Sequence, residues 1–366
     1  MTDGRWNDYY LNEDFASYWI QRARNKNAKA LVIIGLGFDP RCLIALKTLA
    51  GCGFGTRLNC LALKLISRQS FGKSASLMDS LGKSNLSEFE KMGACGSENI
   101  FDVKTHDNEG HYVGGRIAVN ILAKKLENLS TYTDIIVDIS GMPRGIFFPL
   151  VSYLICQADR GKLTNLHVTV VEHPELDACI VGHEFGHADY LHTFRHLDDN
   201  NTIWLPLIGS NEDTRMSEIY NKLKSSCIEI CPIVPFPAET LRRVDDILVK
   251  HSDLLFEGFQ ISPENVILCA ENTPFDIYRK IIDVDEYYRD RLGGLTSIGP
   301  ITTVLSPLSS KTLSLGMLLA AVERTLPVCH VEAGAIEVDV ERMNDIINQS
   351  KYLPKEIWLT GEPYLA

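Results

Sequence analysis

The sequence lacks the features that would place it in a membrane or on a nucleic acid. No segment has 18 uninterrupted apolar residues, and the amino terminus has no basic start followed by an apolar core. We therefore expect no membrane partner and a cytoplasmic location. The 366 residues include 36 Lys and Arg against 47 Asp and Glu, a formal net charge of −11, which argues against an extended nucleic-acid surface. A small anionic ligand is still compatible with this charge, because a few local cations are enough to bind it.

The ten cysteines form no recognisable disulfide or zinc framework. Cys227 and Cys231 make a C-x-x-x-C pair with no second pair downstream. Five others lie within apolar runs that are typical of core strands or helices: Cys42, Cys60, Cys156, Cys269 and Cys329. We expect reduced, buried cysteines that behave as small hydrophobic side chains.

Three common catalytic and nucleotide-binding motifs are also missing. There is no G-x-x-x-x-G-K-[ST] phosphate loop and no G-x-S-x-G nucleophile elbow. The segment GLGFDPR has Pro40 where a dinucleotide-binding G-x-G-x-x-G would have its third glycine. These absences disfavour a nucleoside triphosphatase, a serine hydrolase and a nicotinamide-dependent dehydrogenase.

The sequence instead contains the same alternation of apolar strands and helices twice. Strands that are apolar along their whole length, separated by helices, are typical of parallel sheets covered on both faces. The predicted strands are 30–35, 59–66, 100–105, 134–140 and 166–172 in the first half, and 202–209, 228–236, 265–270, 301–308 and 327–333 in the second. A last strand, 356–361, is expected to close the second sheet. The predicted fold class is α/β, with two tandem doubly wound Rossmann-like domains and mainly parallel sheets.

This pattern predicts four segments. Residues 1–28 form a docking segment that includes a short helix, and residues 29–173 form the first Rossmann-like domain. Residues 174–201 form a connector, and residues 202–366 form the second domain. No low-complexity or Pro-rich linker separates the halves.

The loops at the carboxyl ends of the strands hold the candidate ligand-binding residues, because ligands of open parallel sheets bind at this edge. In the first half these loops follow the first and fourth strands. Glycines permit close approach to the backbone, arginines can fork onto a phosphate or carboxylate, and aspartates can accept from a ribose hydroxyl or orient the arginines. The alternative is that the aspartates cap helices and pair with the arginines. The candidates are Gly37, Asp39, Arg41, Asp138, Ser140, Gly141 and Arg144.

The second half has a similar loop after its fourth strand. SPLSSKTLSLG is expected to run from strand to helix, which favours an anion-binding turn made by Ser309, Ser310, Lys311 and Thr312. The alternative is a helix cap with a solvated lysine. Corresponding loops of both halves thus combine serine with arginine or lysine.

The segments VDISGMPRGIFFPLV and LSPLSSKTLSLGMLLAAVE resemble the CRISPR-associated Rossmann-fold (CARF) sensor domains and related modules of bacterial anti-phage systems. In that group, a Ser/Thr- and Lys-containing loop before an apolar helix holds a nucleotide signal. The resemblance implies a sensor or subunit of a defence complex, which binds a nucleotide or phosphorylated small molecule and has a protein partner or forms a homodimer. It covers the region around the fourth strand of each half. CARF proteins carry a separate effector domain, whereas the second half here repeats the first.

The segment CIVGHEFGHADYLH contains a complete H-E-x-x-H. On a helix, His183 and His187 would share one face and bind zinc, and Glu184 would activate a bound water. The third metzincin histidine is absent, because His192 lies one residue before the required position. A location in the connector also leaves no room for a peptidase domain.

Three functions remain open at this point. The leading hypothesis is a ligand-binding sensor that has no certain cofactor and uses Arg41, Arg144 and the loop of Ser309 to Lys311. The second is a non-catalytic interaction scaffold. The third is an enzyme, either a zinc hydrolase or peptidase that uses His183, Glu184 and His187, or a phosphate-processing enzyme that uses Asp138.

Overall fold

The computed structural model describes residues 4–66, 69–70, 72–93, 97–107, 109, 111–125, 129–194, 201–292, 299–349 and 353–364. The chain divides into two compact units. The large unit comprises Tyr9–Glu184 and Ala333–Ala366, and the small unit comprises Met1–Asp8 and Phe185–Glu332. Neither unit is one continuous piece of chain.

The large unit has a seven-stranded sheet in the order β1-β17-β7-β6-β2-β3-β5. Five of these strands are parallel: β2 (Ala30–Leu36), β3 (Leu58–Ile66), β5 (Ile100–Lys104), β6 (Asp134–Asp138) and β7 (Asn165–Val170). All seven residues of β2 are buried, which is the reason that its sequence is apolar throughout instead of alternating. The last two strands, β17 (Lys355–Thr360) and β1 (Tyr10–Asn12), add antiparallel to the edge at β7.

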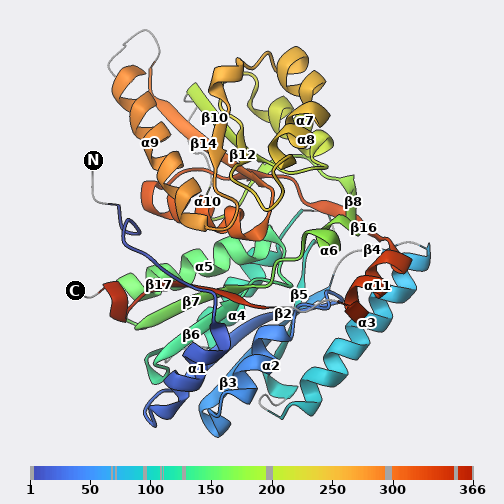
Figure 1. Ribbon diagram of the computed structural model, residues 1–366, viewed down its shortest axis with the longest axis vertical. Helices are drawn as coiled ribbons and strands as arrows, with labels where there is room; N and C mark the ends of the chain where they lie inside the picture. Colours follow the sequence, from blue (N-terminus) through green and yellow to red (C-terminus); the bar gives the residue numbers. More distant parts are fainter. Residues whose placement is uncertain are drawn as a thin grey trace. The chain divides into compact units, whose positions relative to one another are not determined.

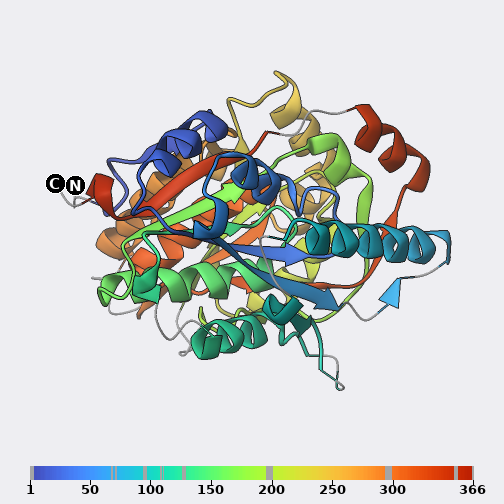
Figure 2. The same ribbon diagram turned by 90° about the horizontal axis from the view of Figure 1, so that it is seen from below.

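Helices cover both faces of this sheet (Figures 1 and 2). One face carries α1 (Phe15–Arg24), α2 (Ile44–Gly51) and α3 (Gly72–Lys91). The other carries α4 (Gly114–Lys125) and α5 (Arg144–Asp159). Helix α1 begins where the Asp14 carboxylate accepts a hydrogen bond from the Ser17 amide, and it buries Phe15, Trp19 and Ala23 at a spacing of four residues.

The prediction that residues 356–361 close the second sheet is wrong. Strand β17 pairs instead with β7 of the large unit, with Ile357 opposite Val168. An apolar strand fits beside any apolar strand of suitable length, so its local pattern does not specify its neighbour.

A second, three-stranded sheet is built from distant segments in the order β4-β16-β8. Its strands are β4 (Gln69–Ser70), β16 (Ala333–Val338) and β8 (Ile180–Phe185). An apolar cluster packs α3, α6 (Pro174–Ala178) and α11 (Val340–Gln349) beside it, with Met78, Leu176, Val338 and Met343 at its centre. The predicted connector therefore contains regular elements, and part of it belongs to this sheet.

The small unit has a five-stranded parallel sheet in which β14 (Ile301–Leu308) pairs with β10 (Asn201–Ile208) over eight residues of each strand. The other edge of β10 contacts β11 (Cys227–Ile230) and β12 (Ile233–Pro235), and β12 pairs with β13 (Ile267–Cys269). Residues 228–236, predicted as one strand, are thus interrupted at Cys231 and Pro232, because proline has no N–H to donate to the ladder.

The fifth predicted strand of the second half is much reduced. Cys329 and His330 form a two-residue strand, β15, which pairs antiparallel with β9 (Asp189–Tyr190), and Ala333 already begins β16. A single parallel bridge, between Leu305 and Val328, joins this segment to β14.

Four long helices complete the small unit. One core cluster joins α7 (Asp213–Leu223) and α8 (Arg243–Lys250) to the face of the sheet that carries Trp204 and Val304. Helices α9 (Pro274–Leu292) and α10 (Lys311–Arg324) pack together on the opposite face (Figure 1).

Short helical turns occur in both units. They are η1 (Gly55–Arg57), η2 (Ser97–Asn99), η3 (Leu129–Thr131), η4 (Asp253–Gly258), η5 (Pro263–Asn265) and η6 (Glu362–Tyr364).

Both units order their parallel strands in the same way. In the large unit β2 is central, with β3 and β5 on one side and β6 on the other; in the small unit β10 is central, with β11, β12 and β13 on one side and β14 on the other. The predicted fold class is confirmed: the chain is an α/β protein with mainly parallel, Rossmann-like sheets. Among the described helices, none combines the length and the apolar character needed to cross a membrane.

Candidate ligand-binding edge

In the large unit, the strand order reverses between β2 and β6. The chain leaves β2 toward β3 on one side, and it returns from β5 to β6 on the other. The loops after β2 and β6 therefore meet at the carboxyl edge, where open α/β sheets bind ligands. A Cβ atom on Gly141 would lie 2.6 Å from the carbonyl oxygen of Gly35 and 2.9 Å from Cβ of Cys42. Only a glycine allows the two loops to come this close.

Arg41 reaches this edge, but it is already paired. Its guanidinium is 2% exposed and binds both oxygens of Asp39, with Nε to Oδ1 at 3.0 Å and Nη2 to Oδ2 at 2.8 Å. Nη2 also lies 2.8 Å from Oδ1 of Asp177. Burial alone would lower the pKa of Arg41, but the two carboxylates outweigh burial and raise it. Arg41 is therefore a buried cation in an acidic setting, as the helix-cap and ion-pair alternative predicted.

Asn85 fixes the loop after β2 from outside. Its side-chain amide donates to the carbonyl oxygens of Gly37 at 2.8 Å and Asp39 at 3.2 Å. This residue lies on α3, which sequence analysis did not connect with the loop. A buried asparagine in an otherwise ordinary amphipathic helix is a weak signal, and only the tertiary contact gives it meaning.

Asp138 and Ser140 link the ends of β6 and β7. The amide of Ser140 donates to Oδ1 of Asp138 at 2.9 Å, and the hydroxyl donates to the same oxygen. The amide of Val171 donates to the Ser140 hydroxyl at 2.8 Å. Both side chains are buried, so they hold the loop after β6 in shape beneath the edge.

Arg144 is the first residue of α5 and is half-buried at the same edge. The preceding residue, Pro143, is extended and its carbonyl oxygen accepts from the amides of Ile146 and Phe147. A cation at this position adds to the positive end of the helix dipole instead of opposing it. Arg144 thus places a positive charge at the amino terminus of α5.

The small unit has an equivalent edge between β10 and β14. A Cβ atom on Gly209 would lie 2.6 Å from the carbonyl oxygen of Leu308, so the two loops again touch. Ser310 caps α10 by accepting from the amide of Leu313 at 3.3 Å, and Lys311 is the first residue of that helix. Ser309 and Thr312 are buried beside it.

A histidine holds the loop after β10. The His251 side chain is buried, with Nδ1 at 2.7 Å from Oδ1 of Asp213 and Nε2 at 2.8 Å from the carbonyl oxygen of Gly209. The two contacts tie the imidazole to the start of α7 and to the loop after β10. His251 directly follows α8, and its contact with this loop has no signal in the sequence.

The two edges therefore share one feature: a cationic residue is the first residue of the helix that follows the fourth strand. Arg144 opens α5 and Lys311 opens α10, each after the strand that flanks the reversal point. Arg144 follows Gly141 by three residues, and Lys311 follows Leu308, whose carbonyl oxygen faces Gly209, by three residues.

The HEFGH segment does not form the helix that a zinc peptidase requires. His183 and Glu184 lie on strand β8, and His187 lies beyond its end. Successive strand residues point to opposite faces, so the four-residue spacing no longer places both histidines together on a helix. Nε2 of His183 lies 2.8 Å from Oε2 of Glu337 on β16. Within the described part of the chain, no group of three His, Cys, Asp or Glu side chains is arranged to hold a metal ion.

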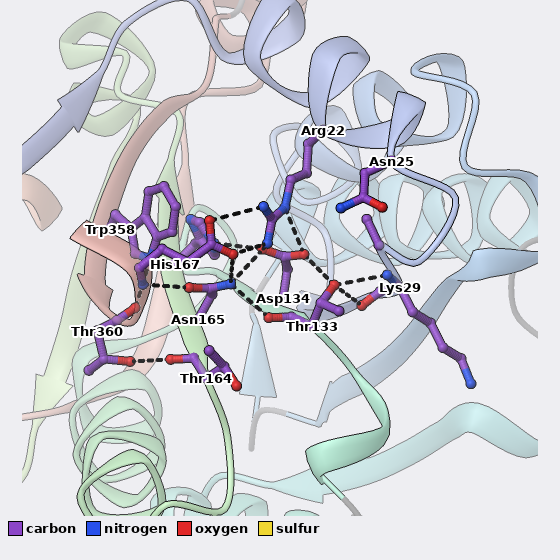
Figure 3. A network of polar contacts seen from close by, with 12 residues as sticks. Arg22, Asn25, Lys29, Thr133, Asp134, Thr164, Asn165, His167, Trp358 and Thr360 are labelled. Carbon is purple, nitrogen blue, oxygen red and sulfur yellow. Dashed lines mark hydrogen bonds and ion pairs between the residues drawn. The ribbon is translucent and has the colours of Figure 1, made fainter. Parts of the chain in front are cut away.

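A buried charge network lies under α1 in the large unit (Figure 3). His167 on β7 has Nδ1 2.8 Å from Oε1 of Glu356 and Nε2 3.4 Å from Oδ1 of Asp134, and all three side chains have no exposed surface. Arg22 of α1 binds Asp134 at 3.0 Å and Glu362 at 2.7 Å. The network joins β6, β7, β17 and α1, and sequence analysis missed it. A histidine within the apolar run LHVTVVE was its only signal.

Comparisons with known proteins identify no family for this chain. No protein-family model matches the sequence, and no curated protein matches it. Among solved structures, one similar chain is described as "Crystal Structure of Putative Universal Stress Protein from Pseudomonas aeruginosa UCBPP-PA14". The match covers 88% of this chain and 98% of that one, at 11% sequence identity and a TM-score of 0.25.

Proposed function

We propose that the protein binds a nucleotide or another phosphorylated small molecule at the carboxyl edge of its Rossmann-like sheets. The observation that carries this proposal is the repeated arrangement of Arg144 and Lys311. Each is the first residue of the helix that follows the strand flanking the reversal point. A positively charged side chain and the free N–H groups of a helix amino terminus both attract a small anion. The nearby glycine lets two loops of the same edge approach each other closely.

The finer role that we propose is that of a sensor or subunit in a bacterial defence complex in the cytoplasm. Its support is the resemblance of the segments around Asp138 and Ser309 to CARF domains. The acidic chain, with a net charge of −11, fits a small ligand better than a long polyphosphate backbone.

Thermal unfolding in the presence of nucleotides tests this function. A ligand that binds only the folded protein adds about 2.7 kcal/mol at a hundredfold excess over its Kd. We expect ATP or another nucleotide to raise the Tm. Arg144→Ala should reduce this rise in the large unit, and Lys311→Ala should reduce it in the small unit. Arg160→Ala is the matched control, because Arg160 lies at the opposite end of α5. No shift with any nucleotide, or full shifts in both edge variants, would contradict the proposal.

A second candidate function is an interaction subunit, and one feature of the small unit favours it. Strand β13 is the last strand of its sheet, and large apolar side chains are exposed on it and on the neighbouring segments. Leu241 is 88% exposed and Val249 is 74% exposed, and Phe236 and Leu268 are also exposed. Exposed apolar side chains gathered in one region are typical of protein-binding surfaces.

Charge substitution separates this function from simple ligand binding. We expect Leu241→Lys with Val249→Lys to abolish co-purification of a partner chain or to convert a dimer to a monomer, while nucleotide binding is retained. Unchanged assembly of the double variant, measured by size-exclusion chromatography with light scattering, would exclude this surface as the interface.

A further inference from the structure

The two carboxylates that hold Arg41 are not equivalent. Asp39 lies two residues before Arg41, uses both oxygens on the guanidinium, and also accepts from the Arg41 amide at 2.9 Å. Asp177 contributes one oxygen, at 2.8 Å from Nη2, and its side chain is 49% exposed. Asp39 is therefore the residue that orients the guanidinium, whereas Asp177 is a single-contact partner on the solvent side.

Asp177 belongs to the same edge of the sheet as the candidate ligand loops. It lies on α6, directly after β7, the strand beside β6. The helix is anchored by Leu176, which is fully buried, and by the hydrogen bond of 3.2 Å from the Leu176 amide to Nδ1 of His173. The Asp177 side chain can rotate outward while α6 stays in place.

The electrostatic consequence is that Arg41 does not attract an anion as long as Asp177 covers it. The guanidinium and the two carboxylates carry a net charge of −1, and a second anion would approach a like charge. When the Asp177 carboxylate moves aside, Arg41 with Asp39 is neutral overall, and an Nη group that can bind one oxygen of a carboxylate or phosphate faces outward.

We propose that Asp177 is a built-in competitor, which occupies on Arg41 the position that the acidic group of the ligand takes. This inference rests on the proposed ligand-binding function and specifies it further. The ligand of the large unit carries a compact oxyanion, a phosphate or carboxylate, which replaces the Asp177 carboxylate on Nη2 while Asp39 keeps the guanidinium in place. Its affinity is limited by the exchange of one anion for another.

Calorimetric titration of the full-length protein with ATP, and with adenosine as the probe that lacks phosphate, tests this inference. Asp177→Asn removes the competing charge and keeps a side chain of the same size, so we expect ATP affinity to rise by about five- to tenfold. Glu175→Gln is the matched control on the same helix, because Glu175 is an exposed carboxylate. We expect this control to change ATP affinity less than twofold, and neither variant to gain affinity for adenosine.

Two outcomes would overturn the inference, and they differ in what they say about function. If the wild-type protein binds ATP and Asp177→Asn binds it no more tightly, Asp177 is not a competitor, but the ligand-binding function stands. If neither protein binds ATP, the competitor role of Asp177 toward this probe is overturned, and the ligand-binding function is overturned as well only when no nucleotide raises the Tm in the thermal unfolding test. A gain in Asp177→Asn that persists after Arg41→Lys is added, in a variant shown to be folded by circular dichroism, would also overturn it, because the gain would not depend on the guanidinium fork.

Discussion

Replacement of His167 by glutamine should destabilise the large unit by about 3–5 kcal/mol, the usual cost of removing one partner from a buried ion pair. His167, Asp134 and Glu356 have no exposed surface, so water cannot compensate the charges that remain. Glutamine can still donate hydrogen bonds through its amide, but it carries no charge. Asp134 would keep Arg22 as its cationic partner, whereas Glu356 would keep the neutral side-chain amide of Asn12.

In thermal unfolding, this loss corresponds to a decrease in Tm of roughly 10 °C for a unit of this size. The chain has two compact units, so the transition should be followed by a probe in the large unit. The fluorescence of Trp19 and Trp358, which pack against His167, is such a probe when Trp6 and Trp204 of the small unit are replaced by Phe. His192→Gln is the matched control, because His192 is exposed. We expect the control to shift Tm by less than 2 °C, since exposed substitutions away from specific contacts change stability little.

The double variant His167→Gln with Glu356→Gln shows whether charge is the cause. Removing the second charge leaves Asp134 with Arg22 and relieves part of the penalty, so the double variant should lose less stability than the sum of the two single variants. A loss below about 1 kcal/mol in His167→Gln, or strict additivity in the double variant, would refute the reasoning.

The same network predicts a pH dependence. Burial opposes the charged imidazole, but the hydrogen bonds and charges of Asp134 and Glu356 outweigh it and raise the pKa of His167. The stabilisation is therefore complete below the unfolded value of about 6.5 and is lost as the pH rises through the folded pKa. Burial would raise the pKa of Asp134, but the bonds to His167, Thr133 and Arg22 lower it. Its contribution is present above about 3.9 and is lost as the pH falls through the folded pKa.

Urea unfolding measured from pH 5 to pH 9 checks this sign. The wild-type large unit should lose stability toward high pH, and His167→Gln should lose much less. An equal slope in both proteins would show that His167 is not the titrating group.

Three further predictions concern packing and reactivity. Gly141→Ala should lower the free energy of unfolding by about 1–3 kcal/mol, measured with denaturant, because the new Cβ would lie 2.6 Å from the Gly35 carbonyl oxygen. Gly82→Ala is the control: no atom lies within 4 Å of its new Cβ, so it should stabilise α3 by about 0.5–1 kcal/mol. Ser140→Ala should cost about 1–3 kcal/mol, because it leaves the buried amide of Val171 without its acceptor, and Ser140→Thr should lose less if the hydroxyl is what matters. Burial raises the pKa of Cys269 to about 12, so this thiol should not react with Ellman's reagent at pH 8 until the protein is unfolded; rapid labelling of folded protein at Cys269 would contradict its burial.

The apolar strands were the most predictable part of the fold. Strand 301–308 was predicted with the bounds that it has, β2 and β3 differ from their predictions by one residue at one end, and β10 is displaced by one residue at both ends. These strands are covered on both faces, so every residue must be apolar, and a local run of sequence is enough to reveal them. The strand at 228–236 was predicted less well, because a single proline interrupts the ladder.

The sequence by itself determined the repeated strand-and-helix plan, because burial on two faces acts on neighbouring residues. The tertiary structure alone decided that β17 joins the first sheet, that Asp177 covers Arg41, and that the HEFGH segment is partly a strand. It also decided that His167 lies between Asp134 and Glu356. Each of these features depends on which distant segment becomes a neighbour. Many contacts across the chain together stabilise that pairing, so no local run of sequence specifies it.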